Sequence, residues 1–311
     1  MSDNKVKVLF IGGYGRSGST LFDRMLGQIE GFFSIGELKF VWERCFAEDQ
    51  LCGCGRPFKE CPFWSAVVKE TFGGFEEVNV KEVMALKNSV DHAARIPLLL
   101  SPYAPAGYKE RLDAYSLLLG KLFSAIKKTS GCEFIVDSSK SPSYGLILSR
   151  TPGVELYVIH LVRDSRAVSF SWQRKRARPE IYWKTVYMPR RGPIEGAIKW
   201  NISNLVIGML RRKAKGYIRV CYEDLVERPR EVMKEVSDFL GRPLKLDFIK
   251  DSTVRLKTNH TVAGNPMRFK HGAIELRPDI EWKEKMPAIR RCLVTVLTSP
   301  LLFNYGYIGR K

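Results

Sequence analysis

The chain has 311 residues, of which 45% are hydrophobic and 27% are charged, which is ordinary for a folded soluble protein with a sizeable core. The formal net charge is +18, from 51 lysines and arginines against 33 acidic residues. Such an excess attracts anions, which include nucleic acid, anionic lipid and multiply charged small molecules. The net charge alone does not indicate which of these is the partner.

Two classes of protein are disfavoured by simple patterns. No apolar run approaches the roughly 20 residues that a membrane helix needs, since the closest stretch, 293–303, is short and contains Pro300. Residues 1–5 lead straight into an apolar run, so no signal peptide is expected and we expect a cytoplasmic protein. There is no arginine-rich tail and no aromatic RNA-binding signature, which disfavours nucleic acid as the partner.

A phosphate-binding loop is predicted near the N-terminus. The apolar run 6–11 predicts a strand, and the apolar spacing over 21–29 predicts a helix. Between them, residues 13–20 have the spacing of a P-loop, except that Ser19 stands in place of the lysine. Backbone N–H groups and the helix N-terminus bind anions, but without the lysine the loop suits a phosphate-like group better than ATP or GTP. The residues expected at this anion are Gly15, Arg16, Ser17, Gly18, Ser19 and Thr20.

Four of the seven cysteines lie close together, at Cys45, Cys52, Cys54 and Cys61. Their spacing, C-x6-C-x-C-x6-C, lacks the short C-x2–4-C hook of zinc sites. Neighbouring glycines and prolines predict a compact irregular segment over 44–65. We favour a tightly packed or locally bridged loop, keep a zinc site as the alternative, and assign no metal to the functional site.

The rest of the chain alternates between helices and strands. Residues 66–128 are predicted to be helical with breaks, so that an insertion of about 44–130 interrupts one domain of 1–311. Strands are predicted at 133–136, 154–162 and 217–221, and helices at 194–215 and from Pro229 onward. Near-continuous apolar strands that alternate with helices predict an α/β fold, a P-loop-type parallel sheet covered by helices on both faces.

Polar side chains follow the predicted strands. Residues 137–140 follow the second strand, Arg163 follows the third and Tyr222 follows the fourth. Ligands of such sheets bind beyond the carboxyl ends of the strands. Arg163 would repel a metal ion and would grip a phosphate together with Ser171, about two turns into the next helix.

The segments 14–21 and 161–171 together resemble the two cosubstrate motifs of sulfotransferases, which use 3′-phosphoadenosine 5′-phosphosulfate (PAPS). The first is similar to their 5′-phosphosulfate loop, and the second to their 3′-phosphate element, whose arginine and serine match Arg163 and Ser171. Residues 222–225 are similar to a segment whose tyrosine, here Tyr222, lies near the adenine. The cysteine loop 52–64 and residues 264–269 resemble features of bacterial-type members. The resemblance implies in-line transfer of a sulfuryl group from PAPS to an acceptor hydroxyl, with no metal required.

The resemblance also implies catalytic roles. Glu37 matches the proposed base of the tyrosylprotein branch, and Lys140 matches a lysine that aids departure of the bridging oxygen. The cytosolic branch uses a histidine, for which His260 is the best alternative here. Arg268, and less securely Arg277, would add to the 3′-phosphate site. Arg16 would stabilise the phosphosulfate.

Several alternatives stay open at this point. His160 lies inside a predicted strand and is expected to be structural. The basic stretch 174–191 is expected to be a solvated face, with a cover over the cosubstrate as its alternative. A P-loop small-molecule kinase and a basic nucleic-acid-binding protein are the competing functions. The acceptor, which is a small-molecule, glycan, lipid or peptide hydroxyl, and the oligomeric state are not fixed by the sequence.

Overall fold

The computed structural model of the protein describes residues 5–309. Residues 1–4, on which the expectation of no signal peptide partly depends, and residues 310–311 lie outside the described part. The centre of the molecule is a sheet of five strands in the order β2-β3-β1-β4-β5, and every neighbouring pair is parallel. The strands are β1 (Val6–Gly13), β2 (Phe32–Gly36), β3 (Phe134–Lys140), β4 (Val154–Val162) and β5 (Gly216–Cys221).

Helices account for most of the remaining described chain. The α-helices are α1 (Ser19–Leu26), α2 (Pro62–Phe72), α3 (Val80–Val90), α4 (Ile96–Leu100), α5 (Ala106–Ser130), α6 (Pro142–Leu148), α7 (Ser165–Gln173), α8 (Pro193–Met209), α9 (Tyr222–Glu227), α10 (Pro229–Leu240), α11 (Glu281–Lys285) and α12 (Ala288–Asn304). Short helical turns are η1 (Leu38–Phe40), η2 (Val41–Ala47), η3 (Phe58–Glu60), η4 (Ala93–Arg95), η5 (Leu210–Arg212) and η6 (Pro266–Phe269). The helical segments α2 to α5 lie between β2 and β3 in the chain, where a helical insertion is predicted from the sequence.

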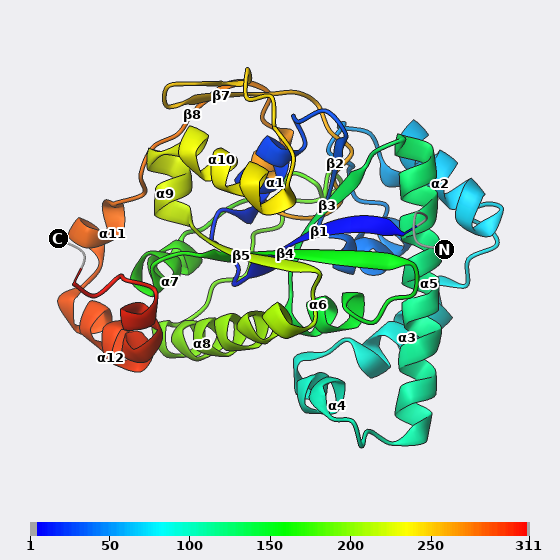
Figure 1. Cartoon of the computed structure of the whole chain (residues 1–311), viewed down its shortest axis with the longest axis horizontal. Coiled ribbons are helices and arrows are strands. Elements are labelled where there is room, and N and C mark those ends of the chain that lie inside the picture. Colours follow the sequence, from blue (N-terminus) through cyan, green and yellow to red (C-terminus); the bar gives the residue numbers. More distant parts are fainter. Residues whose placement is uncertain (1–4, 310–311) are drawn as a thin grey trace.

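Helices cover both faces of the parallel sheet, as the sequence predicts. Successive side chains of a strand point to opposite faces. Accordingly, Val8 and Phe10 join a core with residues of α5, α6 and α8, whereas Leu9 and Ile11 join a core with residues of α1, α9 and α10. Figure 1 shows α1, α9 and α10 above the sheet and α6 and α8 below it. Burial on both faces explains why the strands read as near-continuous apolar runs.

Two strand regions were not predicted. β2 is one of the two edge strands of the parallel sheet and has only five residues, with Ser34 in its middle. A second sheet of three short antiparallel strands, β6 (Ile249–Lys250), β7 (Thr253–Leu256) and β8 (Gly272–Glu275), lies beyond α10 in the chain. Val254 and Leu256 of β7 pack into the same core as α1, so this small sheet closes that face of the molecule.

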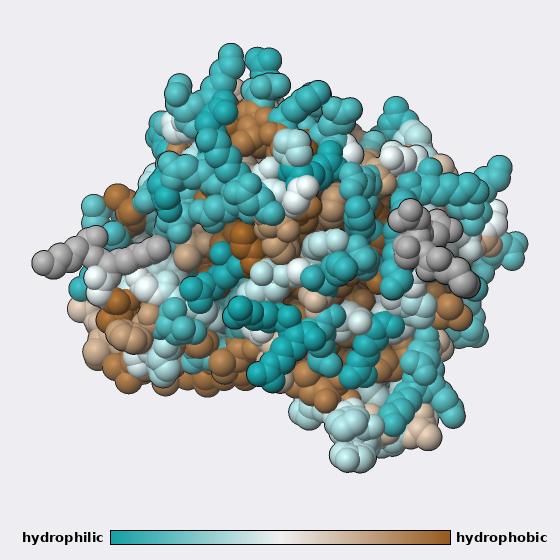
Figure 2. Space-filling model, viewed as in Figure 1, coloured by the Kyte–Doolittle hydropathy of each residue, from teal (hydrophilic) through white to brown (hydrophobic). Residues whose placement is uncertain are grey.

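The hydropathy of the surface differs between the upper and lower parts of the face that Figure 2 shows. Figure 2 shows hydrophilic side chains over the upper part of this face and hydrophobic ones along its lower edge, where α8 runs. Exposed apolar residues recur along α8 at helical spacing, at Ile194, Ile198, Ile202, Leu205 and Met209. Within residues 5–309, no helix is both long and apolar enough to cross a membrane.

Candidate active site

Every strand of the parallel sheet has a candidate residue at its end or in the loop that follows it. β1 leads into the loop 14–18, and β2 ends one residue before Glu37. Lys140 is the last residue of β3, Arg163 follows β4, and Tyr222 follows β5. Because parallel strands end at the same edge of a sheet, all five positions converge there. The sequence located four of these strand ends, and the fifth is β2.

A cavity of about 920 Å³ opens at this edge. Its lining comes from the strand ends and from segments far apart in the chain, including 39–44, 87–96, 171–191 and 264–279. Among the described lining residues, ten are cationic and four are acidic, which favours an anionic ligand. The cationic ones are Arg16, Lys39, Arg44, Lys87, Lys140, Arg163, Arg176, Arg191, Lys199 and Arg277, and the acidic ones are Glu37, Asp91, Glu275 and Asp279.

The loop after β1 is packed so closely that its glycines cannot carry a side chain. A Cβ on Gly15 would lie 2.7 Å from the ring of Trp172, and a Cβ on Gly18 would lie 2.3 Å from the ring of Tyr222. Gly18 also has φ of 84°, in the left-handed region that favours glycine. Helix α1 begins directly afterwards, so its positive N-terminal end faces the loop.

The members of the loop differ in exposure to the cavity. Gly15, Arg16, Gly18, Ser19 and Thr20 line it, as the sequence predicts for an anion-binding loop. Ser17 is not among the lining residues, and its buried hydroxyl has no hydrogen-bond partner within the protein.

Arg16 is held in an unusual backbone conformation, with φ of 73°. Its guanidinium group lies 4.9 Å from the ring centroid of Trp172, and its buried Nε has no hydrogen-bond partner. Burial, and secondarily the charge of Arg176, lowers the pKa of Arg16 to about 10. The group is therefore still charged at neutral pH, with donor capacity left for a ligand.

Arg163 links the loop to the other end of the cavity. Its Nη1 donates to the carbonyl oxygen of Arg16 at 2.8 Å, and its Nη2 donates to Oδ2 of Asp279 at 2.9 Å. The guanidinium lies 4.3 Å from the ring centroid of Tyr222, while its buried Nε has no partner. Ser171, buried on α7, lines the same cavity.

Asp279 sits between two guanidinium groups, since Arg174 also donates to its carboxylate, at 3.0 and 3.1 Å. Burial acts to raise the pKa of Asp279, but hydrogen bonds from Arg174 and Arg163 more than offset it, so the net pKa is lowered. Two arginines that converge on one carboxylate are arranged to hold an anion.

Glu37 and Lys140 form an ion pair in the wall of the cavity. The Nζ of Lys140 donates to Oε1 of Glu37 and, at 3.0 Å, to the carbonyl oxygen of Ser138. Lys140 has φ of 64°, a conformation that non-glycine residues seldom adopt outside functional sites and turns. The backbone of Glu37 is fixed by a hydrogen bond, in which its N–H donates to the carbonyl oxygen of Val262 at 2.8 Å.

Two sequence-based candidates lie elsewhere. Arg268 is 1% exposed and does not line the cavity, because its guanidinium donates to the carbonyl oxygens of Thr261 and Leu51. The Nδ1 of His260 lies 3.2 Å from the sulfur of Cys61, and His260 is also absent from the cavity lining. The geometry therefore does not support Arg268 as a phosphate ligand or His260 as a base, whereas Arg277 does line the cavity.

His160 is structural, as its place in a predicted strand indicates. It is 1% exposed, and its ring nitrogens lie 2.6 Å from the hydroxyl of Tyr217 and 2.8 Å from Oδ1 of Asn204. Burial lowers the pKa of His160 to about 4, so the ring is neutral at physiological pH.

Other residues of the cavity were missed or misjudged from the sequence. Asp279 and Trp172 carried no motif that would single them out. The basic stretch 174–191 is not simply a solvated face, because Arg176 and Arg191 line the cavity and Arg174 pairs with Asp279. Only Trp172 could have been found from the sequence, because it directly follows Ser171, which was predicted to bind phosphate.

Comparison with known proteins identifies relatives. A sequence model described as the Sulfotransferase family matches residues 9–245. The sulfotransferase domain from the Synechococcus PCC 7002 olefin synthase superposes with a TM-score of 0.50 at 20% identity, covering 96% of this chain and 95% of that one. This likeness shows a shared fold.

Two further solved structures were found at lower similarity. The sulfotransferase domain from the curacin biosynthetic pathway has a TM-score of 0.49 at 17% identity, with 95% of this chain and 97% of that one covered. Sulfotransferase STF9 from Mycobacterium avium has a TM-score of 0.40 at 13% identity, with 76% and 64% covered. No curated protein gives a significant sequence match.

Proposed function

The chain belongs to the sulfotransferase family, and we propose that it transfers the sulfuryl group of PAPS to a hydroxyl group of an acceptor by in-line displacement. The observation that carries this proposal is a pair of arginine-containing anion sites at one sheet edge, around Arg16 and around Arg163. PAPS has negative charge at two ends, on its 5′-phosphosulfate and on its 3′-phosphate. Arg16, beside the ring of Trp172, and Arg163, beside the ring of Tyr222, would each serve one of these ends.

The unused hydrogen-bonding capacity of the two arginines supports this assignment. The Nε atoms of Arg16 and Arg163 are buried without a partner in the protein. Leaving a buried charged donor unpaired costs about 1–3 kcal/mol or more. Because both arginines also line the cavity, these two atoms are expected to serve a ligand. We assign the phosphosulfate to Arg16 and the backbone N–H groups of 15–20, and the 3′-phosphate to Arg163 and Ser171. Tyr222 would lie near the adenine.

The chemical step needs a base and a stabiliser for the leaving oxygen. The acceptor oxygen attacks sulfur, its proton passes to the carboxylate of Glu37, and a new S–O bond forms. The S–O bond to the 5′-phosphate breaks, and its electron pair stays on the bridging oxygen. Lys140, which contacts Glu37 in the wall of the cavity, would stabilise the charge on that oxygen. The products are a sulfate ester and adenosine 3′,5′-bisphosphate.

Arg16 would act on the same developing charge. Its guanidinium is fixed by the ring of Trp172 and by a left-handed backbone conformation. A donor that is already oriented needs little reorganisation during reaction, which is the main source of rate acceleration in group transfer of this kind.

Calorimetric titration in buffer without divalent cations tests the proposal. Adenosine 3′,5′-bisphosphate is expected to bind, and to bind far more tightly than ATP with or without magnesium. The Arg163→Ala variant is expected to bind it more weakly. Magnesium-dependent binding of ATP with no binding of the bisphosphate would instead indicate a kinase.

A further inference from the structure

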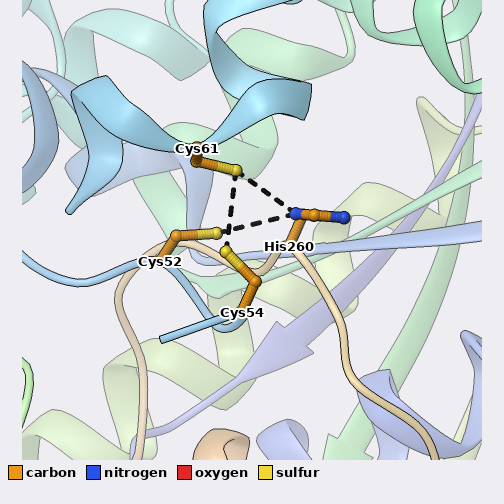
Figure 3. A group of neighbouring side chains, drawn as sticks. All are labelled: Cys52, Cys54, Cys61 and His260. Carbon is orange, nitrogen blue, oxygen red and sulfur yellow. Dashed lines mark hydrogen bonds between the residues drawn. The ribbon is translucent and has the colours of Figure 1, made fainter. Parts of the chain in front are cut away.

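Three cysteines and one histidine gather outside the cavity. Cys52 and Cys54 lie in the loop before η3, Cys61 precedes α2, and His260 comes from the segment between β7 and β8. Their three sulfur atoms and one ring nitrogen all lie within 4.8 Å of one another. Figure 3 shows the four side chains pointing toward a common centre.

The distances match a tetrahedral metal site. Bond lengths of 2.3 Å to sulfur and 2.0–2.1 Å to nitrogen place the ligand atoms of tetrahedral zinc about 3.8 Å apart for two sulfurs and about 3.5 Å for sulfur and nitrogen. The Sγ atoms of Cys54 and Cys61 are 3.8 Å apart. The Nδ1 of His260 lies 3.2 Å from Sγ of Cys61 and 4.0 Å from Sγ of Cys52. The four ligand atoms are thus close enough together for small side-chain shifts to bring them around one ion.

The backbone around the four residues is well held. The N–H of Gly55 donates to the carbonyl oxygen of Cys52 at 2.9 Å, which tightens the turn between the first two cysteines. The indole N–H of Trp64 donates to the carbonyl oxygen of His260 at 2.7 Å. The ring of Phe63 stacks on the imidazole, with centroids 5.3 Å apart. The imidazole orientation therefore does not depend on a metal ion alone.

We propose that Cys52, Cys54, Cys61 and His260 bind one Zn²⁺ ion as a structural site. Three thiolates with one imidazole form a closed four-ligand set of the kind that structural zinc takes, with no place left for a substrate. Soft sulfur ligands disfavour magnesium and calcium. Cys45, the fourth cysteine of the sequence cluster, is buried in the same core as Cys52 and Cys61 but is not part of this group.

The zinc site would join the cysteine loop to the segment that supports Glu37. The N–H of Gly53 donates to the carbonyl oxygen of Thr261 at 2.9 Å. The next residue, Val262, pairs with both sides of the turn that carries Glu37, since its N–H donates to Ile35 and its carbonyl accepts from Glu37. A metal ion that fixes His260 would thereby fix the backbone that supports Glu37.

Elemental analysis of the purified protein tests the site without any activity assay. The full chain is produced in zinc-supplemented medium and purified under reducing conditions, and its zinc content is measured beside that of two variants. Cys61→Ala removes a ligand, and Cys45→Ala removes a buried cysteine of the same core as a matched control. About one zinc per chain is expected in the wild type and in Cys45→Ala, with at least a tenfold loss in Cys61→Ala.

Cobalt substitution of the wild type keeps the test valid if Cys61→Ala fails to fold. Thiolate-to-cobalt charge transfer and the strong visible bands of tetrahedral Co²⁺ are expected, and both should disappear on adding excess zinc. Folded, reduced wild-type protein that contains no zinc and gives no such cobalt spectrum would overturn the proposal. A disulfide between two of the three cysteines, found in the metal-free native protein by mass spectrometry, would also overturn it.

Discussion

The cavity and the Cys–His cluster are built in opposite ways. Arg16, Glu37, Lys140, Arg163 and Tyr222 lie at or shortly after the ends of the strands of one parallel sheet, so the topology of the sheet brings them together. The cluster joins Cys61 to His260, which are 199 residues apart and lie on irregular segments. The first arrangement follows from strand order, whereas the second depends on the packing of two loops. The segment 260–264 connects them, because it carries His260 and supports Glu37.

Removal of Arg16 should have the largest effect and should separate the two regions most clearly. Arg16→Ala is expected to lower kcat/KM by about 10²–10³, as loss of an oriented donor to developing charge does. Zinc content should stay unchanged, because Arg16 is not part of the Cys–His cluster. Steady-state kinetics with PAPS measures the effect, and Arg211→Ala, an exposed arginine outside the cavity, is the control. Equal activity of both variants would contradict the role of Arg16.

Glu37→Gln separates chemistry from binding within the cavity. Turnover is expected to fall by about 10²–10⁴, because an amide cannot accept the proton of the acceptor hydroxyl. The affinity for adenosine 3′,5′-bisphosphate, measured by calorimetry, should change little. Unchanged turnover would remove Glu37 from the mechanism.

Gly53→Ala tests whether the cluster and the cavity are coupled. A Cβ at residue 53 would lie 2.0 Å from Oδ1 of Asn259 and 2.7 Å from Oγ1 of Thr261, so the segment beside His260 must move. We expect a stability loss of about 1–3 kcal/mol, reduced zinc content and a several-fold fall in kcat. Gly196→Ala, where a Cβ meets nothing within 4 Å, is the matched control for unfolding and kinetics. A stability loss with unchanged kcat would show that the two regions are independent.

Asp279→Asn sharpens the description of the anion site at Arg163. The carboxylate of Asp279 competes with a phosphate for Arg163 and Arg174, so its neutralisation should tighten binding of the bisphosphate. The expected gain is about fivefold, or about 1 kcal/mol, the scale of a partly exposed ion pair. Calorimetry measures it, and weaker binding would mean that Asp279 positions the arginines instead.

Asp23→Asn should have the smallest effect on activity, because Asp23 does not line the cavity; it concerns the stability of the fold around it. Burial raises the pKa of Asp23 from 3.8 to about 8, and a hydrogen bond from Ser34 opposes this only in part. Between these pH values the folded protein binds more protons than the unfolded chain, so stability falls as the pH rises from 4 to 8. The slope is at most about 1.4 kcal/mol per pH unit.

Denaturant unfolding at several pH values checks this slope. The Asp23→Asn variant should lose most of it, whereas Asp113→Asn, at an exposed position, should keep it. A slope that survives in Asp23→Asn would assign it to another buried group.

The sequence predicted the cavity better than the cluster for a physical reason. A buried parallel strand leaves an apolar run in the sequence, and the residue after it lies at the ligand-binding edge. This rule located Arg163, Lys140 and Tyr222. It failed for β2, a short edge strand interrupted by Ser34, and Glu37 was found only through the family resemblance.

Residues from irregular segments gave no such signal. Arg268 and His260 are close in the chain to residues that line the cavity. The guanidinium of Arg268, however, donates to a backbone carbonyl oxygen, and the ring of His260 faces the cysteines. The cysteine spacing lacks the short C-x2–4-C hook of zinc sites, so the sequence favours a packed loop over a zinc site, and it carries no sign that His260, 199 residues after Cys61, joins the cysteines. Asp279 likewise reaches Arg163 only through the packing of the C-terminal segments.

A crystal structure of the chain soaked with adenosine 3′,5′-bisphosphate tests the central claim most directly. The 5′-phosphate is expected on the backbone N–H groups of residues 15–20, and the 3′-phosphate within hydrogen-bond distance of Arg163 and Ser171. A nucleotide bound elsewhere, or one whose phosphates contact neither the loop nor Arg163, would contradict the account.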